Sequence, residues 1–369
     1  MPPSTTSESD RLSTRTKWAI LFGGGLILLI VLALAAEFAI RYRQARIHGT
    51  AATIEKFYTV DERIGLRVPI ANLTLGHVST NSLGFRGPEI AVPKPEGTTR
   101  VAFLGASTTW CAEVTGNDKV WAHLVAEGLR KAFDGAKIDY VNGAAPGYVV
   151  KSSLKNLEHR VEPLQPDIVV IYHATNDMSV ELRRLAAAKG VIEQAKVQPP
   201  SWLADRSLLW NLAEKNLRIW LAQRKAERNA GRLEVDAASL GGGFRGDLLA
   251  LVRGAQKESR VVAVATFATR LRRGQGDEEQ LQAAASALYY MPFMTPRGLI
   301  GAYERYNQVI REVASETGAL LIDGETAIPG DALHFADSVH FTDAGSRAMA
   351  TRVSSALGGS AEVRALLSR

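Results

Sequence analysis

Five short apolar runs, each followed by a loop and an amphipathic stretch, set the pattern of the chain beyond residue 98. The runs are "RVAFLGA" (100–106), "DYVNGA", "DIVVIYHA", "RVVAVATFA" and "GALLIDG", with helical patterns such as 120–133 and 299–318 between them. Buried β-branched strands that alternate with amphipathic helices are typical of a parallel sheet covered on both faces. We therefore predict an α/β fold with a flavodoxin-like, doubly wound, five-stranded parallel sheet. Active sites in such folds lie at the carboxyl ends of the strands.

The beginning of the chain shows no such alternation. Residues 18–36, "WAILFGGGLILLIVLALAA", contain no charged side chain and follow a polar tail, residues 1–17. As a helix this run spans roughly 28 Å, close to the hydrocarbon thickness of a bilayer. A buried core helix would normally have a polar face, which this run lacks. We predict an uncleaved transmembrane signal-anchor helix over 18–40; a signal peptide cleaved near Ala33-Leu34-Ala35 is the alternative.

These patterns divide the chain into segments. After the anchor we expect a juxtamembrane linker and leader (41–98), a catalytic domain (99–357) and a C-terminal tail (358–369). A helical insertion at about 178–258 interrupts the strand–helix rhythm after the third strand and contains Trp202, Trp210 and Trp220. We interpret these tryptophans and the neighbouring leucines as packing residues. The alternative is a lid over the active site, or a surface that touches membrane or polymer.

Composition narrows the classes of partner. The 369 residues are 46% hydrophobic and 22% charged, with a net charge of +6 and one cysteine, Cys111. Such a chain can form a globular core, and its basic charge suits contact with phospholipid or acidic polysaccharide. The basic residues are scattered, so no nucleic-acid partner is predicted. One cysteine excludes an internal disulfide and a multi-cysteine metal site. No metal cluster, phosphate loop or dinucleotide fingerprint is present, and we predict no cofactor.

The stretch "DALHFADSVHFTDAG", residues 331–345, raises a chemical question. Asp337 and His340 lie three residues apart, just before a helix start. A carboxylate in that place can orient a histidine as general base for a nucleophile. Ser107, between the first strand and the next helix, is the candidate nucleophile, although alone it reads better as a helix N-cap.

Two more strand ends supply hydrogen-bond donors. The second strand leads to Gly147, in a loop where a bare backbone N–H can face a ligand, and the third leads to Asn176. Each taken alone fits an ordinary turn or cap. Together, the N–H groups of Ser107 and Gly147 and the Asn176 amide would form an oxyanion hole for a tetrahedral intermediate. The combination predicts a hydrolase, and the absence of G-x-S-x-G argues against the ordinary α/β-hydrolases.

At this point the chain resembles the SGNH/GDSL hydrolase superfamily. "FLGAST", "NGAAPG", "HATND" and "DSVHFTDAG" occur in the order of its four sequence blocks. The resemblance covers roughly residues 97–357 and implies that Ser107, Gly147, Asn176 and His340 take the four name-giving roles, with Asp337 completing a triad. "NSLGFRGPE" (81–89) is similar to a leader in membrane-anchored bacterial members, which have an extracytoplasmic catalytic domain.

The sequence departs from the superfamily pattern at three positions. Ala106 replaces the acidic residue of Gly-Asp-Ser, Ala174 replaces the glycine of Gly-x-Asn-Asp, and Cys111 stands where related sequences often carry glycine. None of these changes removes a candidate catalytic side chain. They bear on the identity of the substrate and on turnover.

We therefore expect a serine esterase that removes a short acyl group from a carbohydrate or lipid-like ester. Two alternatives remain open: an O-acyltransferase that modifies a cell-envelope polysaccharide, and an inactive anchored binding module. Basic residues flank both ends of the apolar run, so the charge rule does not orient it. From the resemblance we expect the catalytic domain outside the cytoplasm, in the periplasm.

Overall fold

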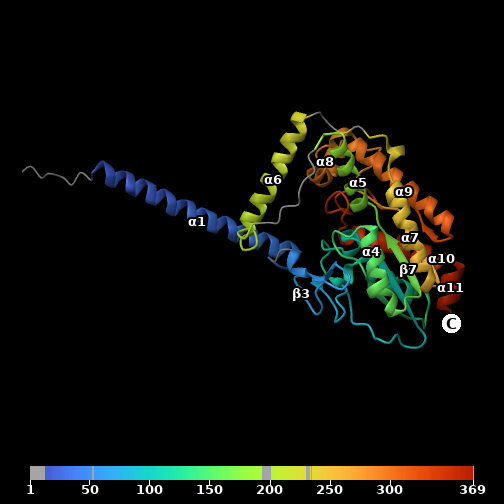
Figure 1. Cartoon of the computed structure of the whole chain (residues 1–369). Helices are drawn as coiled ribbons and strands as arrows, with labels where there is room; N and C mark the ends of the chain where they lie inside the picture. The colour runs from blue at the N-terminus through green and yellow to red at the C-terminus, as the bar shows by residue number, and fades with distance from the viewer. Residues whose placement is uncertain (1–12, 52–53, 193–200, 230–232, 234, 369) are drawn as a thin grey trace, which may run out of the picture.

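The computed structural model describes residues 13–51, 54–192, 201–229, 233 and 235–368. A long helix, α1 (Thr14–His48), projects from an α/β body, and α6 (Leu208–Asn229) stands between the two (Figure 1). The other helices are α2 (Ser107–Trp110), α3 (Trp121–Ala132), α4 (Val150–Asn156), α5 (Thr175–Ala188), α7 (Gly242–Glu258), α8 (Asp277–Tyr290), α9 (Pro296–Thr317), α10 (Asp343–Gly359) and α11 (Ala361–Leu367).

The body is built on one five-stranded sheet in which every neighbouring pair is parallel. Its spatial order is β6-β5-β7-β8-β9, which is the flavodoxin-like order 2-1-3-4-5. The strands are β5 (Thr98–Gly105), β6 (Lys137–Asn142), β7 (Ile168–Tyr172), β8 (Val261–Ala265) and β9 (Leu320–Ile322). The predicted fold class is confirmed, since all five predicted apolar runs form the strands of this sheet.

Burial explains why apolar and polar residues do not alternate in those runs. Every residue of the central strands β7 and β8 is buried, because helices cover both faces of the sheet. Helices α3 and α10 pack on each other in one layer, while α4, α7 and α9 form the other. The amphipathic runs predicted at 120–133 and 299–318 correspond to α3 and α9, which turn their apolar sides to this core.

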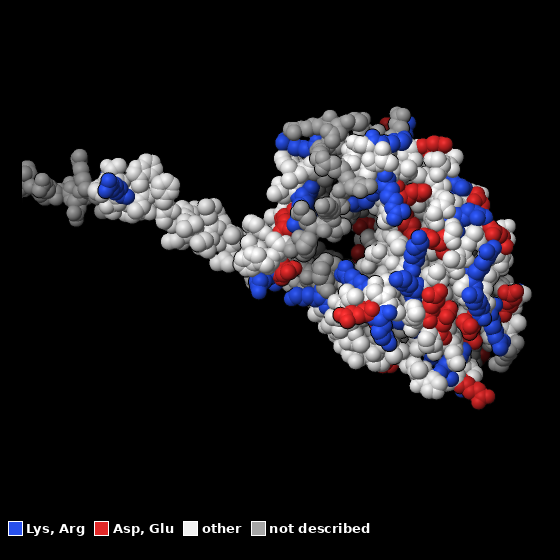
Figure 2. Space-filling view, viewed as in Figure 1, with Lys and Arg blue, Asp and Glu red and all other residues white. Residues whose placement is uncertain are grey.

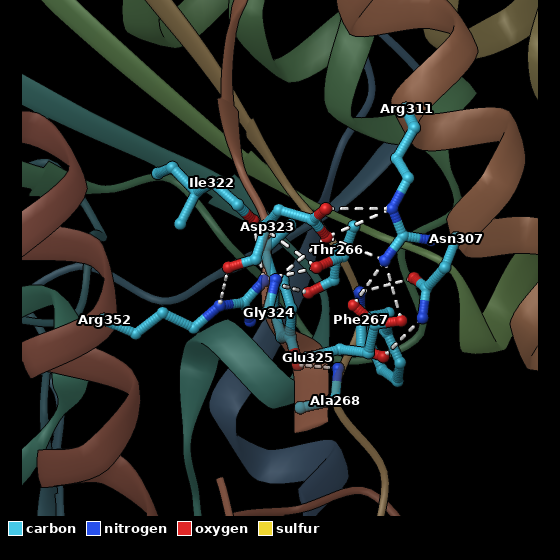
Figure 3. A network of polar contacts seen from close by, with 11 residues as sticks. Thr266, Phe267, Ala268, Asn307, Arg311, Ile322, Asp323, Gly324, Glu325 and Arg352 are labelled. Carbon is cyan, nitrogen blue, oxygen red and sulfur yellow. Dashed lines mark hydrogen bonds and ion pairs between the residues drawn. The ribbon is translucent and has the colours of Figure 1, made fainter. Parts of the chain in front are cut away.

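A polar network ties α9 and α10 to the carboxyl ends of β8 and β9 (Figure 3). Arg352 of α10 donates to the carbonyl of Ile322 at 2.6 Å and to the carbonyl of Thr266 at 2.9 Å. The amide of Asn307 in α9 donates to the Phe267 carbonyl at 3.0 Å and accepts from the Phe267 N–H at 2.6 Å. These backbone groups lie at the end of β9 and just past the end of β8, so the network fixes the edge of the sheet from which the His340 loop emerges.

The leader before the sheet forms two small antiparallel hairpins. Strands β1 (Tyr58–Asp61) and β2 (Leu66–Pro69) make the first, and β3 (Thr74–Leu75) and β4 (Val78–Ser79) the second. Their apolar side chains form a small core with Ala106, the N-cap of α2, and Trp110, its last residue. Ala144, Ala145 and Tyr148 of the loop after β6 belong to the same core. The leader therefore packs directly behind the predicted nucleophile.

Helix α1 extends beyond the predicted anchor, residues 18–40, at both ends. Among the described residues it is the one helix long and apolar enough to cross a membrane, over Thr14–Arg46, and none of its apolar window is buried in the protein. A core helix would be covered by neighbours, so that alternative is excluded. A membrane span and a signal sequence both fit this length and composition.

Where the structure describes it, the predicted insertion, residues 178–258, holds most of α5 and the whole of α6 and α7. Helix α5 buries Met178, Leu182 and Ala186, and α7 packs against α4 and α9, so both belong to the layers around the sheet. Helix α6 differs, because its contacts run largely to α1. The interpretation of the tryptophans here as packing residues is wrong: Trp202, Trp210 and Trp220 are 66%, 49% and 45% exposed.

Candidate active site

Ser107 is the first residue of α2, and one residue, Ala106, separates it from the end of β5. The strand ends at Gly105, where an added Cβ would lie 2.1 Å from Thr109 Oγ1 and 2.9 Å from the Tyr172 carbonyl oxygen. Glycine at this position therefore allows the turn to close tightly against the neighbouring strand. The N-cap of α2 is Ala106, and the Ser107 hydroxyl forms a hydrogen bond with His340 instead of capping the helix.

His340 and Asp337 lie in the loop between β9 and α10. His340 Nε2 is 2.8 Å from Ser107 Oγ, and His340 Nδ1 is 2.8 Å from Asp337 Oδ2. The other oxygen, Asp337 Oδ1, accepts the backbone N–H groups of Val339 and His340 at 2.8 Å and 2.9 Å. The three-residue spacing thus lets one carboxylate orient its own loop and the imidazole together.

Neighbouring contacts hold this loop in place. Ser338 is buried, and its hydroxyl donates to the Ala283 carbonyl of α8 at 2.7 Å. At the start of α10, Asp343 accepts from the N–H and hydroxyl of Thr115 at 2.9 Å and 2.6 Å, which links the loop to the segment after α2. The two halves of the site, 233 residues apart in sequence, are therefore joined by more than the Ser107–His340 contact.

The loop after β6 brings Gly147 to the same region. Gly147 has φ of +84°, a left-handed conformation that favours glycine, and its neighbours Ala145 and Tyr148 pack in the same small core as Ala106. Within the described part of the chain, the backbone N–H groups of Ser107 and Gly147 have no hydrogen-bond acceptor. Both donors are therefore available to a ligand.

Asn176 lies in the first turn of α5 and does not cap it, because the N-cap is Ala174. Its amide donates one hydrogen bond, to the Tyr148 carbonyl at 2.8 Å. An amide NH₂ carries two hydrogens, so the second remains for another acceptor. The same side chain can thus hold the Gly147 loop and offer a donor.

One imidazole, of His340, and two carboxylates, of Asp337 and Glu113, set the electrostatics of the site. Burial lowers the pKa of His340, but the carboxylates of Glu113 and Asp337 outweigh burial and raise it to about 9. Burial raises the pKa of Asp337, yet the hydrogen bond and charge of His340 bring it below its usual value. Glu113 Oε1 lies 4.0 Å from His340 Nδ1, and its Oε2 is buried without a hydrogen-bond partner among the described residues.

Two residues of this region were not found from the sequence. Glu113 carries no motif, and only the fold brings it beside His340. Arg86, within the leader "NSLGFRGPE", is 1% exposed and donates to the carbonyls of Trp110 and Cys111 at the end of α2, at 2.7 Å and 2.5 Å. It supports the Ser107 helix from behind, and the resemblance of the leader was the signal available for it.

Cys111 explains one departure from the superfamily pattern in physical terms. It ends α2 with φ of +57°, the left-handed region in which glycine has no steric penalty. Its side chain is buried, and burial raises the pKa of the thiol to about 12. The thiol is therefore not poised as a nucleophile.

A second serine–histidine pair lies deeper in the body. Ser153 Oγ is 2.7 Å from His173 Nε2, and Asp177 is 4.0 Å from the other ring nitrogen. Ser153 is fully buried, and burial lowers the pKa of His173 to about 3. This pair lacks access to substrate and therefore serves as an internal comparison for Ser107 and His340.

The raised pKa of His340 gives a pH prediction. A neutral imidazole is needed to accept a proton from Ser107, so kcat/KM should increase with pH until His340 is deprotonated. The midpoint of this increase should lie above the ordinary histidine pKa of about 6.5 and toward 9, and below it kcat/KM should change about tenfold per pH unit. Glu113→Gln removes a negative charge, lowers this pKa and should shift the acid limb to lower pH, raising kcat/KM at pH 7.

The same pKa shift of His340 affects stability. The protonated imidazole stabilises the fold fully below the unfolded pKa of about 6.5. This contribution is lost as pH rises through the folded pKa of about 9.

Glu278→Gln, at an exposed position of α8, makes the same change in net charge away from the site. Its pH–rate profile should match that of the natural chain. An unshifted acid limb in Glu113→Gln would contradict the role assigned to this carboxylate.

The parallel sheet gathers a serine, a histidine and an aspartate where its strands end, an arrangement that fits acyl hydrolysis. The sequence model of the GDSL-like lipase/acylhydrolase family matches residues 103–348, more than half of the chain. The chain belongs to this family, which confirms the SGNH/GDSL resemblance and makes the protein an ester-hydrolysing enzyme. No curated protein sequence matches the chain.

Solved structures that align with this chain include an esterase, a lipase/acylhydrolase and an α/β hydrolase. An acetylxylan esterase from Geobacillus stearothermophilus is 17% identical, with a TM-score of 0.42, over 72% of this chain and 96% of that one. The lipase/acylhydrolase from Enterococcus faecalis is 17% identical, with a TM-score of 0.42, over 71% and 96%. The α/β hydrolase LAE5 from the metagenome of Lake Arreo is 14% identical, with a TM-score of 0.42, over 70% and 94%.

Proposed function

We propose that the protein is a membrane-anchored serine esterase in which Ser107 is the nucleophile, His340 the general base and Asp337 the group that orients it. The observation that carries the proposal is the unbroken line of two 2.8 Å contacts, Ser107 Oγ to His340 Nε2 and His340 Nδ1 to Asp337. Triads are recognised by such geometry and not by sequence position. The proposed catalytic domain is residues 99–357, with the linker, tail and insertion at the bounds predicted from the sequence.

The reaction follows from these positions. Ser107 Oγ attacks the ester carbonyl carbon while its proton passes to His340 Nε2. The carbonyl oxygen becomes an oxyanion, to which the N–H groups of Ser107 and Gly147 and the Asn176 amide donate. The C–O bond to the alcohol then breaks, and the alcohol leaves with the proton from His340. Water, deprotonated by the same histidine, attacks the acyl-enzyme and releases the acid and free Ser107.

We further propose that the substrate is a short-chain acyl ester of a carbohydrate or a lipid-like molecule. Hydrolysis and transfer share the first half of the reaction and differ in whether water or a sugar hydroxyl takes the acyl group. The inactive-module reading requires that the aligned Ser107, His340 and Asp337 do no chemistry. Their hydrogen bonds support a working site instead.

Active-site labelling tests the proposal. A fluorophosphonate should label the natural chain at Ser107, and a panel of acetylated sugars and acyl esters should then identify hydrolysed substrates. Absence of both labelling and hydrolysis in folded protein would favour the inactive module. Acetyl transfer to a sugar acceptor, in competition with water, would favour the acyltransferase.

We propose that α1 is retained and crosses the membrane with the N-terminus inside and the body outside the cytoplasm. Alkaline phosphatase fused to the C-terminus should be active, and green fluorescent protein fused there should be dark. The same fusions lacking residues 1–40 are the control and should reverse both signals. Bright fluorescence from the full chain would place the body in the cytoplasm, and loss of residues 1–36 from the mature protein would indicate a cleaved signal.

A further inference from the structure

Glu37 joins α1 to the start of α6. It is the first charged residue after the apolar run, and its carboxylate accepts the N–H groups of Leu208 and Leu209 at 3.0 Å and 2.7 Å. The Ser207 hydroxyl also donates to it, at 2.9 Å. These are the N–H groups that an isolated helix leaves unpaired at its N-terminus. Glu37 therefore fixes the start of α6 at the level where the apolar surface of α1 ends.

Two sides of α6 differ in what they contact. Lys215 Nζ lies 2.9 Å from the Tyr290 hydroxyl, and the Asn216 amide oxygen accepts from the Tyr289 hydroxyl, so this side faces α8 and the body. Trp210, Leu217 and Leu221, spaced by seven and four residues, lie on the opposite side of the helix. They are 49%, 55% and 53% exposed. The apolar side thus faces away from α8.

This exposed side is continuous with the apolar surface of α1. Trp210 and Leu209 line a shared apolar hollow with Ile30, Ala33 and Leu34 of α1. From that junction α6 runs crosswise to α1, and the α/β body lies beyond it (Figure 1). A helix that starts at the end of a membrane span and runs across it lies along the membrane surface.

Two arginine–tryptophan pairs, one in the segment before α6 and one within it, fit that position. The guanidinium of Arg206 lies 5.4 Å from the ring centre of Trp202, and that of Arg224 lies 4.1 Å from the ring centre of Trp220. Tryptophan is enriched at membrane interfaces because its ring is apolar and its N–H polar, and arginine pairs with lipid phosphate. Figure 2 shows Lys and Arg side chains along α6 and a hollow between it and the body.

We propose that α6 is a second membrane contact, an interfacial helix that lies on the same bilayer that α1 crosses. Trp210, Leu217 and Leu221 enter the boundary between headgroups and acyl chains, and the arginines of the two Arg–Trp pairs face lipid phosphate. Together, α1 and α6 fix the orientation of the body above the lipid surface. This inference rests on the proposed membrane span of α1.

Depth-dependent quenching tests this placement in the full chain. Three variants each introduce one cysteine: Leu29→Cys in α1, Leu217→Cys in α6 and Leu281→Cys in α8. Each cysteine is labelled with an environment-sensitive fluorophore, and the protein is placed in vesicles of phosphatidylcholine and phosphatidylglycerol. Leu281 is 52% exposed on the body and is the matched control, while buried Cys111 stays unlabelled in the natural chain. Lipids spin-labelled near the headgroup or deep in the acyl chain act as quenchers.

We expect shallow quenchers to reduce the fluorescence at position 217 several-fold, deep quenchers to act at position 29, and neither to act at 281. Quenching at 29 without quenching at 217 would overturn the interfacial helix and leave the membrane span intact. A label at 217 that is shielded from water but unquenched would overturn it in favour of a protein partner. If position 29 is unquenched, the membrane span of α1 itself fails.

Discussion

Replacing Ser107 with alanine should lower kcat by about 10⁴-fold or more, with the fold unchanged. The reason is that Ser107 Oγ is the atom that faces His340 Nε2 at 2.8 Å, and without it no acyl-enzyme can form. Hydrolysis of p-nitrophenyl acetate, measured on purified protein of known melting temperature, checks the result. Labelling by a fluorophosphonate should be lost in the same variant.

Ser153→Ala is the matched control, since Ser153 also hydrogen-bonds a histidine, His173, at 2.7 Å. That serine is fully buried, so its loss should leave kcat per folded molecule within a few-fold of the natural value. Near-normal activity in a folded Ser107→Ala would remove Ser107 from its assigned role. A large loss of kcat in a folded Ser153→Ala would instead contradict the statement that the buried pair takes no part in the reaction.

Asn176→Ala should lower kcat by about 10²–10³-fold, roughly 3–4 kcal/mol, with little change in KM. The amide contributes most when negative charge develops on the substrate oxygen, so its loss affects the transition state more than the bound substrate. Phosphonate labelling of Ser107 should slow without vanishing, because His340 stays in contact with Ser107.

The competing interpretation makes Asn176 a purely structural residue. Its amide donates to the Tyr148 carbonyl at 2.8 Å, and losing one such bond typically costs about 1 kcal/mol of stability. Melting temperature and kcat measured on one sample separate the two roles. A lower melting temperature with unaltered kcat would remove Asn176 from the oxyanion hole.

The position of α6 bears on what the esterase can reach. If α1 and α6 both hold the protein to one bilayer, the α/β body stays close to the lipid surface. Esters carried by lipids, or by polymers attached near the membrane, would then be presented at high local concentration.

Much of the fold was predictable because it depends on local pattern. Strands β7 and β8 are buried along their whole length, and a strand without a polar face can lie only inside a covered sheet. The placement of Ser107 and His340 followed from the same pattern, since the carboxyl ends of parallel strands meet at one edge. The Asp337–His340 contact is local, spanning three residues, and could be read from their spacing.

The interpretation of the tryptophans as packing residues was wrong because it, too, relied on local pattern alone. Leucine and tryptophan at helical spacing identify an apolar face, but the pattern does not say what covers it. In α6 the covering element is absent among the described residues, and Trp210 meets α1 instead. A membrane-facing helix and a core helix carry similar apolar faces, and only tertiary contacts tell them apart.

The sequence by itself determined the parallel sheet, the apolar N-terminal helix and the candidates Ser107, Asp337 and His340, because each is expressed in periodicity or short spacing. The tertiary structure alone decided which distant groups surround them. Glu113 beside His340, Arg86 behind α2 and Glu37 at the start of α6 make contacts that no periodic pattern encodes. A single charged residue leaves no repeating signal along a chain, and its partner is known only when the fold has brought the two together.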